Sequence, residues 1–112
     1  MPRATSVQEV FDMIPSRFLP EKAGDLKAVI QFDLNGDGGG QHYLSIGDQA
    51  CTVQPGLSPN PSMTLSASAA DFLGLMNGEL NAMQAFMQGK IRVKGDVSLA
   101  MKMQAIFGIG AP

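Results

Sequence analysis

The sequence of 112 residues is 45% hydrophobic but only 16% charged, with 8 basic and 10 acidic side chains. This length is typical of one domain with its own core, so we expect a single domain over residues 1–112. The net charge of −2 argues against a nucleic-acid interface, and the single Cys51 excludes an internal disulfide or a cysteine-based zinc cluster.

The start of the chain is polar and lacks the apolar stretch of a secretory signal. No apolar run approaches the ~20 residues that span a bilayer. A lone cysteine also fits a reducing compartment. We therefore expect a soluble, cytoplasmic protein.

The first predicted element is a helix over residues 7–14. Ser6 and Glu9 have the spacing of a capping box, in which each side chain satisfies a backbone donor of the first turn. Pro15 is expected to kink or end this helix. Its apolar residues form one stripe: Val7, Val10, Phe11, Ile14 and Phe18.

Strands are predicted next, because apolar residues alternate and glycine-rich or proline-containing turns separate the runs. The segment 57–62, rich in Pro, Ser and Asn, is expected to be a loop. The four predicted strands are residues 27–34, 41–46, 50–54 and 63–67.

The last third of the chain favours helices around one more strand. Ser68 is expected to start a helix that Asn77-Gly78 ends, and a short helix follows up to Gly89. Residues 90–95 alternate basic and β-branched side chains, which predicts a strand, and Asp96 is expected to cap a final helix. Strands followed by helices indicate an α+β fold.

No motif predicts a metal, a cofactor or a catalytic group. Asp33 to Gly38 matches the first half of a calcium loop, but its twelfth position is Leu44 and not a carboxylate, so we interpret it as a turn. His42 and Tyr43 are strand neighbours that point to opposite faces. We expect a surface His42, a packed Tyr43 and an inert Cys51.

Methionines gather on the predicted helices of the last third, at Met76, Met83, Met87, Met101 and Met103. Because methionine is flexible and polarizable, this pattern suits an irregular core or the deformable wall of an apolar pocket. The pattern alone leaves both interpretations open.

From Ile30 to Phe107 the sequence resembles the sterol-binding domain of the sterol carrier protein type 2 family. The resemblance rests on Phe32 to Gly36, on the Pro55-Gly56 turn and, most specifically, on the stretch from Ala85 to Gln104. The end of the chain lacks the peroxisomal signal of eukaryotic relatives, which suggests a stand-alone, prokaryotic-like member.

The resemblance implies a five-stranded, mostly antiparallel sheet with helices covering one face and an apolar lipid tunnel between sheet and helices. It implies a non-enzymatic protein that binds or transfers a fatty acid, fatty acyl-coenzyme A, sterol or phospholipid. Gln104 is a candidate headgroup contact. The residues expected at the ligand are Phe32, Leu34, Phe72, Leu75, Met76, Leu80, Met83, Phe86, Met87, Val93, Met103, Gln104, Ile106 and Phe107.

Two alternatives accompany this hypothesis, and the role of one basic surface is left open. The domain could be an accessory domain or small enzyme that acts on an apolar substrate with Asp33 or Asp71 as a buried acid. It could instead be an interaction module with a filled core. The basic residues Lys90, Arg92 and Lys94 could dock transiently to an anionic membrane or form a merely solvated strand surface.

Overall fold

A computed structural model describes residues 5–96, 98, 99, 102 and 106. Its first helix, α1 (Val7–Arg17), starts at Ser6, whose hydroxyl oxygen accepts a hydrogen bond from the Glu9 N–H at 3.2 Å. The Glu9 carboxylate accepts from the N–H and hydroxyl of Thr5, so the capping box reaches one residue further out than predicted. The helix also passes through Pro15 and ends three residues later than expected, because a proline near the last turn removes only one backbone donor.

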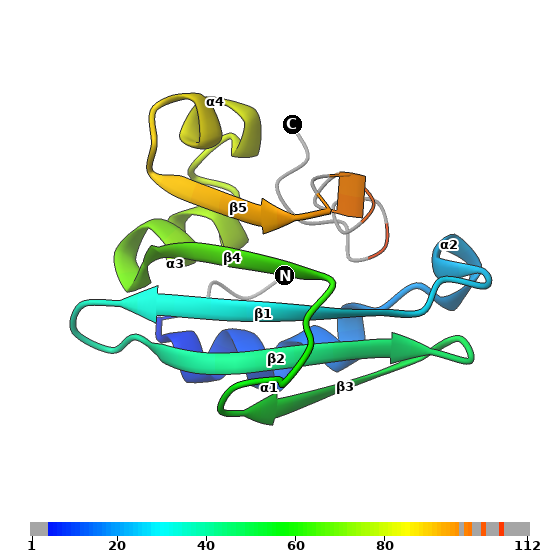
Figure 1. Cartoon of the computed structure of the whole chain (residues 1–112). Helices are drawn as coiled ribbons and strands as arrows, with labels where there is room; N and C mark the ends of the chain where they lie inside the picture. Colours follow the sequence, from blue (N-terminus) through cyan, green and yellow to red (C-terminus); the bar gives the residue numbers. More distant parts are fainter. Residues whose placement is uncertain (1–4, 97, 100–101, 103–105, 107–112) are drawn as a thin grey trace.

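A five-stranded sheet in the order β3-β2-β1-β4-β5 forms the second layer (Figure 1). Only the pair β1–β4 is parallel, and the other three pairs are antiparallel, which confirms the predicted five-stranded, mostly antiparallel sheet. The strands are β1 (Ala28–Asn35), β2 (Gly40–Gly47), β3 (Ala50–Pro55), β4 (Met63–Ser68) and β5 (Ile91–Gly95).

Three further helices complete the described elements, α2 (Pro20–Ala23), α3 (Ala69–Met76) and α4 (Ala82–Met87). The hydroxyl of Ser68 accepts from the Asp71 N–H at 3.1 Å, so the predicted start of α3 is confirmed. After β5, the carboxylate of Asp96 accepts from the Ser98 N–H at 3.0 Å, and Ser98, Leu99, Lys102 and Ile106 have helical backbone geometry. No helix among the described residues is long and apolar enough to cross a bilayer.

Helices α1 and α3 cover the same face of the sheet, where alternate strand residues are apolar and buried (Figure 1). Phe11 of α1, Phe32 of β1 and Phe72 of α3 meet at ring-centroid distances of 5.3 to 5.6 Å. These edge-to-face and stacked contacts join both helices to the middle of the sheet. The core therefore lies between the sheet and these two helices.

The opposite face of the sheet carries no helix among the described elements, but the segment 56–62 crosses it from β3 to β4 (Figure 1). The buried side chain of Gln31 holds this segment. Its amide donates to the carbonyls of Gly56 (3.1 Å) and His42 (3.0 Å), and its oxygen accepts from the Ser58 N–H at 2.7 Å. A buried amide with these bonds is stabilising because its polar atoms stay paired.

Candidate functional site

Four of the residues expected at a ligand lie together in the core. Phe32, Leu34, Phe72 and Leu75 are all buried between β1 and α3. Met76 and Val93 are half-buried and pack against this core, and Leu80 is also half-buried. The structure thus brings together the predicted residues of the sheet and of α3 as one continuous apolar layer.

Helix α4 is placed differently from the prediction. Met83, Phe86 and Met87 are 56%, 44% and 77% exposed, whereas Ala85 is buried. These three side chains thus lie at the surface of the described fold, and their contact with a ligand stays a prediction. The physical reason is the helical period, since Phe86 lies about 100° and Met83 and Met87 about 160° around the axis from Ala85, so a helix that turns Ala85 inward leaves these three outside.

Among the predicted residues of the last helix, Ile106 is buried and Met103, Gln104 and Phe107 lie outside the described residues. Ile106 lines a pocket of about 310 Å³ together with Lys22, Ala23, Leu26 and Lys102. The backbone carbonyl of Ile106 accepts from the Leu19 N–H at 3.0 Å, which fixes this segment beside α2. Its lining combines apolar side chains with two exposed lysines, a combination that suits an amphiphile with an acidic head.

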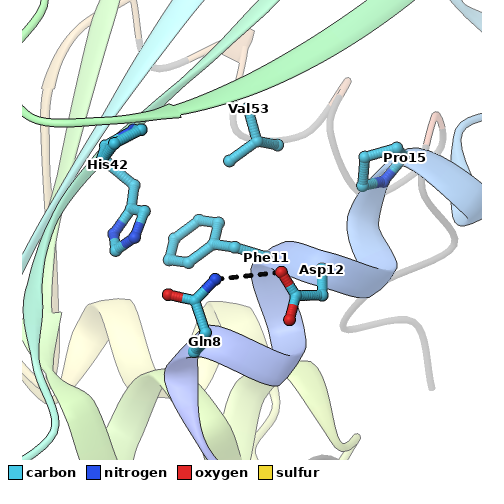
Figure 2. Close-up of a pocket in the computed structure, with 7 residues that line it drawn as sticks. Gln8, Phe11, Asp12, Pro15, His42 and Val53 are labelled. Atoms are coloured by element: carbon cyan, nitrogen blue, oxygen red, sulfur yellow. Dashed lines mark hydrogen bonds between the residues drawn. The ribbon is translucent and has the colours of Figure 1, made fainter.

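A second pocket, of about 330 Å³, lies between α1 and the strands β2 and β3 (Figure 2). The His42 ring stacks on Phe11 at 4.2 Å, and its Nδ1 is buried with no hydrogen-bond partner in the described part of the chain. Burial lowers the pKa of His42, which favours the neutral imidazole. The lining residues are Gln8, Phe11, Asp12, Pro15, His42, Val53 and Pro55.

Sequence reasoning missed this second pocket, and His42 is half-buried instead of lying on the surface as predicted. A usable signal was present. One face of α1 has the spacing i, i+3, i+4, i+7 and consists of Gln8, Phe11, Asp12 and Pro15. Of these four residues, only Phe11 belongs to the predicted apolar stripe. On that face Gln8 donates to the Asp12 carboxylate at 3.0 Å, so the rim is polar and the floor is apolar (Figure 2).

The two candidate acids do not form a buried acid site. Asp33 is exposed on the helix-free face of the sheet, so the buried-acid hypothesis is wrong for this residue. Asp71 is half-buried and sits in the first turn of α3. A carboxylate there is favoured by the helix dipole, which is a structural role.

Cys51 and Tyr43 are the next side chains considered as reactive groups. Burial raises the pKa of the half-buried Cys51 thiol, in agreement with the predicted inert cysteine. Tyr43 is half-buried on the face opposite His42. Among the described residues, no group of three or more His, Cys, Asp or Glu side chains is placed to hold a metal ion.

The model of the SCP-2 sterol transfer family matches residues 11–108. The chain belongs to this family. The matched residues include all five strands and the four helices except the first residues of α1, so the resemblance noted in the sequence is confirmed.

Solved structures agree with this assignment. Palmitated SCP2L2 from Aedes aegypti superposes with a TM-score of 0.77 at 25% identity, covering 92% of this chain and 95% of that one. Sterol carrier protein 2 from Yarrowia lipolytica, in its apo form, gives 0.66 at 27% identity, covering 88% and 86%. The α+β fold predicted from the sequence is thereby confirmed.

Curated relatives carry the same domain inside longer proteins. Hydroxysteroid dehydrogenase-like protein 2 of Rattus norvegicus is 30% identical over 106 residues, which is 94% of this chain but 20% of the relative. The chain therefore spans about a fifth of that relative's length. Its similarity concerns the sterol carrier domain and not a complete dehydrogenase-like protein.

Proposed function

We propose that this protein is a non-enzymatic carrier that binds an amphiphilic lipid, preferably one with an acidic head such as a fatty acid. Family membership supports lipid binding, and the related Aedes aegypti protein is palmitated. The observation that supports an acidic head is the pocket of about 310 Å³, which Lys22 and Lys102 line together with Ala23, Leu26 and Ile106. An acid at this place gains two favourable charge interactions while its first methylenes lie on apolar side chains.

The apolar part of the ligand is proposed to run from this pocket between the helices and the sheet. Phe32, Leu34, Phe72 and Leu75 provide its deep wall, and Met76, Leu80 and Val93 its half-buried margin. Met83, Phe86 and Met87 of α4 are exposed and thus available to cover a bound chain. Met103, Gln104 and Phe107 complete the proposed set.

The energetics permit useful affinity. A chain of about 14 buried carbons gains about 11 kcal/mol at about 0.8 kcal/mol per methylene. Subtracting an association cost of at least about 4 kcal/mol leaves affinity in the micromolar range. Because this gain depends on area more than on shape, we expect broad selectivity among acyl chains.

Native mass spectrometry of the purified protein tests the proposal first, because a carrier of this kind should retain lipid from its host. The second test is fluorescent fatty-acid binding by a Met83→Asp/Phe86→Asp variant. Both side chains are exposed, so circular dichroism should stay unchanged while binding is lost. Leu57→Asp is the matched control, since Leu57 is 65% exposed on the crossing segment and should tolerate the same change.

The head preference has its own test. Lys22→Gln should weaken fatty-acid binding more than binding of a neutral sterol, because only the acid interacts with the ammonium group. Equal losses for both ligands would remove the pocket from the proposal. A wild-type protein that retains no lipid and binds no fluorescent fatty acid would overturn the carrier function itself.

A second candidate function is an accessory domain that presents an apolar substrate to an enzyme, and the fivefold greater length of the dehydrogenase-like relative favours it. The two functions differ in how the lipid leaves. A carrier should pass fluorescent lipid to acceptor vesicles without help, whereas a presenting domain should hold it until its enzyme is added.

A further inference from the structure

Helix α4 presents an apolar surface that the described fold leaves uncovered. Of the five large hydrophobic side chains that are exposed among the described residues, three belong to this six-residue helix. Isolated exposed hydrophobic residues are common, but a cluster of Met83, Phe86 and Met87 on one short helix marks an interaction surface.

A row of basic residues continues directly from this helix. Lys90, Arg92 and Lys94 are all exposed on and just before β5, the edge strand of the sheet. Since Ile91 and Val93 face the helices, Arg92 and Lys94 point to the opposite, helix-free side. These three residues account for three of the eight basic residues in the chain, and residues 28–89 contain none.

The backbone fixes these two groups relative to each other. The N–H of Lys90 donates to the Ala85 carbonyl at 2.9 Å, and the N–H of Gly89 donates to the Phe86 carbonyl at 3.1 Å. Gly89 has a φ of 77°, which a glycine adopts without strain, so the chain can turn sharply from α4 into β5. In the fold α4 lies beyond β5 at one end of the sheet, away from β3 (Figure 1).

A purely solvated edge strand would explain the basic residues, because lysine protects sheet edges from pairing with other chains. It does not explain why Phe86 and Met87 are exposed beside them. The acidic residues of this segment lie at its two ends, Glu79 before α4 and Asp96 after β5, and Asp33 is exposed on the same helix-free face two strands away from Arg92. The carboxylate of Asp96 is already engaged by Ser98.

We propose that α4 and β5 form a docking surface for anionic phospholipid bilayers, made of Met83, Phe86, Met87, Lys90, Arg92 and Lys94. The apolar side chains enter the boundary between headgroups and acyl chains, and the basic side chains interact with the lipid phosphates. The inference rests on the proposed carrier function, for which the membrane is the place where lipid is loaded and released.

Co-sedimentation with vesicles tests the charge part. Wild-type protein should pellet with phosphatidylglycerol/phosphatidylcholine vesicles, release them at high salt, and bind pure phosphatidylcholine weakly. Lys94→Glu should reduce affinity for the anionic vesicles about 25-fold, from about fivefold for the lost attraction and about fivefold for the new repulsion. The control Lys27→Glu changes the net charge equally at an exposed lysine before β1 and should bind as wild type.

A fluorescent reporter tests the apolar part. The chain contains no tryptophan, so Met87→Trp introduces a single one on α4, and Leu57→Trp introduces one on the crossing segment as a control. With anionic vesicles, Met87→Trp should shift to the blue and become protected from acrylamide, while Leu57→Trp should not change.

Equal losses for Lys94→Glu and Lys27→Glu, or a blue shift at Leu57→Trp instead of Met87→Trp, would overturn the docking surface. Equal binding to neutral and anionic vesicles would do the same. Fluorescent fatty-acid binding separates this inference from the carrier function. Lys94→Glu should bind the fatty acid normally, whereas a wild-type protein that docks to vesicles but binds no fatty acid would refute only the carrier function.

Discussion

The interior between the sheet and helices α1 and α3 contrasts with the end of the molecule formed by α4 and β5. Both regions are rich in the apolar residues that the sequence assigned to one ligand wall. In the interior, Phe72 is fully buried and packs against Phe11 and Phe32. On α4, Met87 is 77% exposed.

The difference shows that apolar spacing on a helix identifies one face but does not determine that the fold buries this face. Helix α1 has eleven residues and buries a full stripe against the sheet, whereas α4 has six and buries Ala85. Apolar residues that cannot reach the core remain at the surface, where they can interact with lipid. The two regions should therefore respond in opposite ways to substitution.

The largest expected effect is on stability at Phe72. Replacing Phe72 with Ala should lower the free energy of unfolding by about 3–5 kcal/mol, because a buried ring is lost and a cavity remains. Met87→Ala should change it by less than about 0.5 kcal/mol. Urea denaturation of both variants measures the contrast, and similar losses would show that α4 is part of the core.

A second substitution probes how β5 is held to the rest of the fold. Gly95 has a φ of 94°, and a Cβ there would lie 2.6 Å from the Ser62 carbonyl oxygen. Gly95→Ala should cost about 2–4 kcal/mol, since a left-handed conformation and a backbone clash add together. Gly78 also has a positive φ but open space, so Gly78→Ala should cost only about 1 kcal/mol in the same urea experiment.

The helix-free face offers a third test. Gln31→Leu should remove the bonds that hold Gly56 and Ser58 and cost about 1–3 kcal/mol, because half-buried backbone groups lose their partner. Amide hydrogen exchange of residues 56–62 should accelerate. Gln54→Leu, an exposed change on the adjacent strand β3, should leave both measurements unchanged, and equal exchange in the two variants would contradict the role of Gln31.

Much of the fold could be predicted because it depends on local chemistry. Alternation identified the strands, Ser68 and Asp96 were predicted as helix caps, and the glycine turns gave the order of the elements. The parallel pairing of β1 with β4 depends on the segment 56–62, which Gln31 of β1 holds from 25 to 27 positions away in the sequence. Such a contact has no local signature.

Burial of the residues expected at a ligand could be predicted for β1 and for α3, where Phe72 and Leu75 are buried. Phe32 and Leu34 alternate on a central strand, so their inward direction was determined by the strand itself. The exposure of Phe86 depends on which face of α4 packs against the rest of the fold, and the sequence of the helix does not determine this face. The pocket at Lys22 and Lys102 joins residues 80 positions apart in the sequence, which no spacing could have connected.

The smallest expected effect concerns His42 at the margin of the interior. Because burial lowers the pKa of His42 below its usual value of 6.5, the unfolded chain binds a proton at a higher pH than the folded protein does. Stability should therefore be retained above pH 6.5 and decrease as the pH falls through the lowered pKa. His42→Phe keeps a ring against Phe11 without a titrating group, so its urea midpoint should change less between pH 7 and pH 5 than that of the wild type.

The carboxylates of Glu9 and Asp96, whose pKa values are lowered by hydrogen bonds from Thr5 and Ser98, titrate below this window. An identical pH dependence in the two proteins would show that the stacked imidazole stays as accessible to protons as in the unfolded chain.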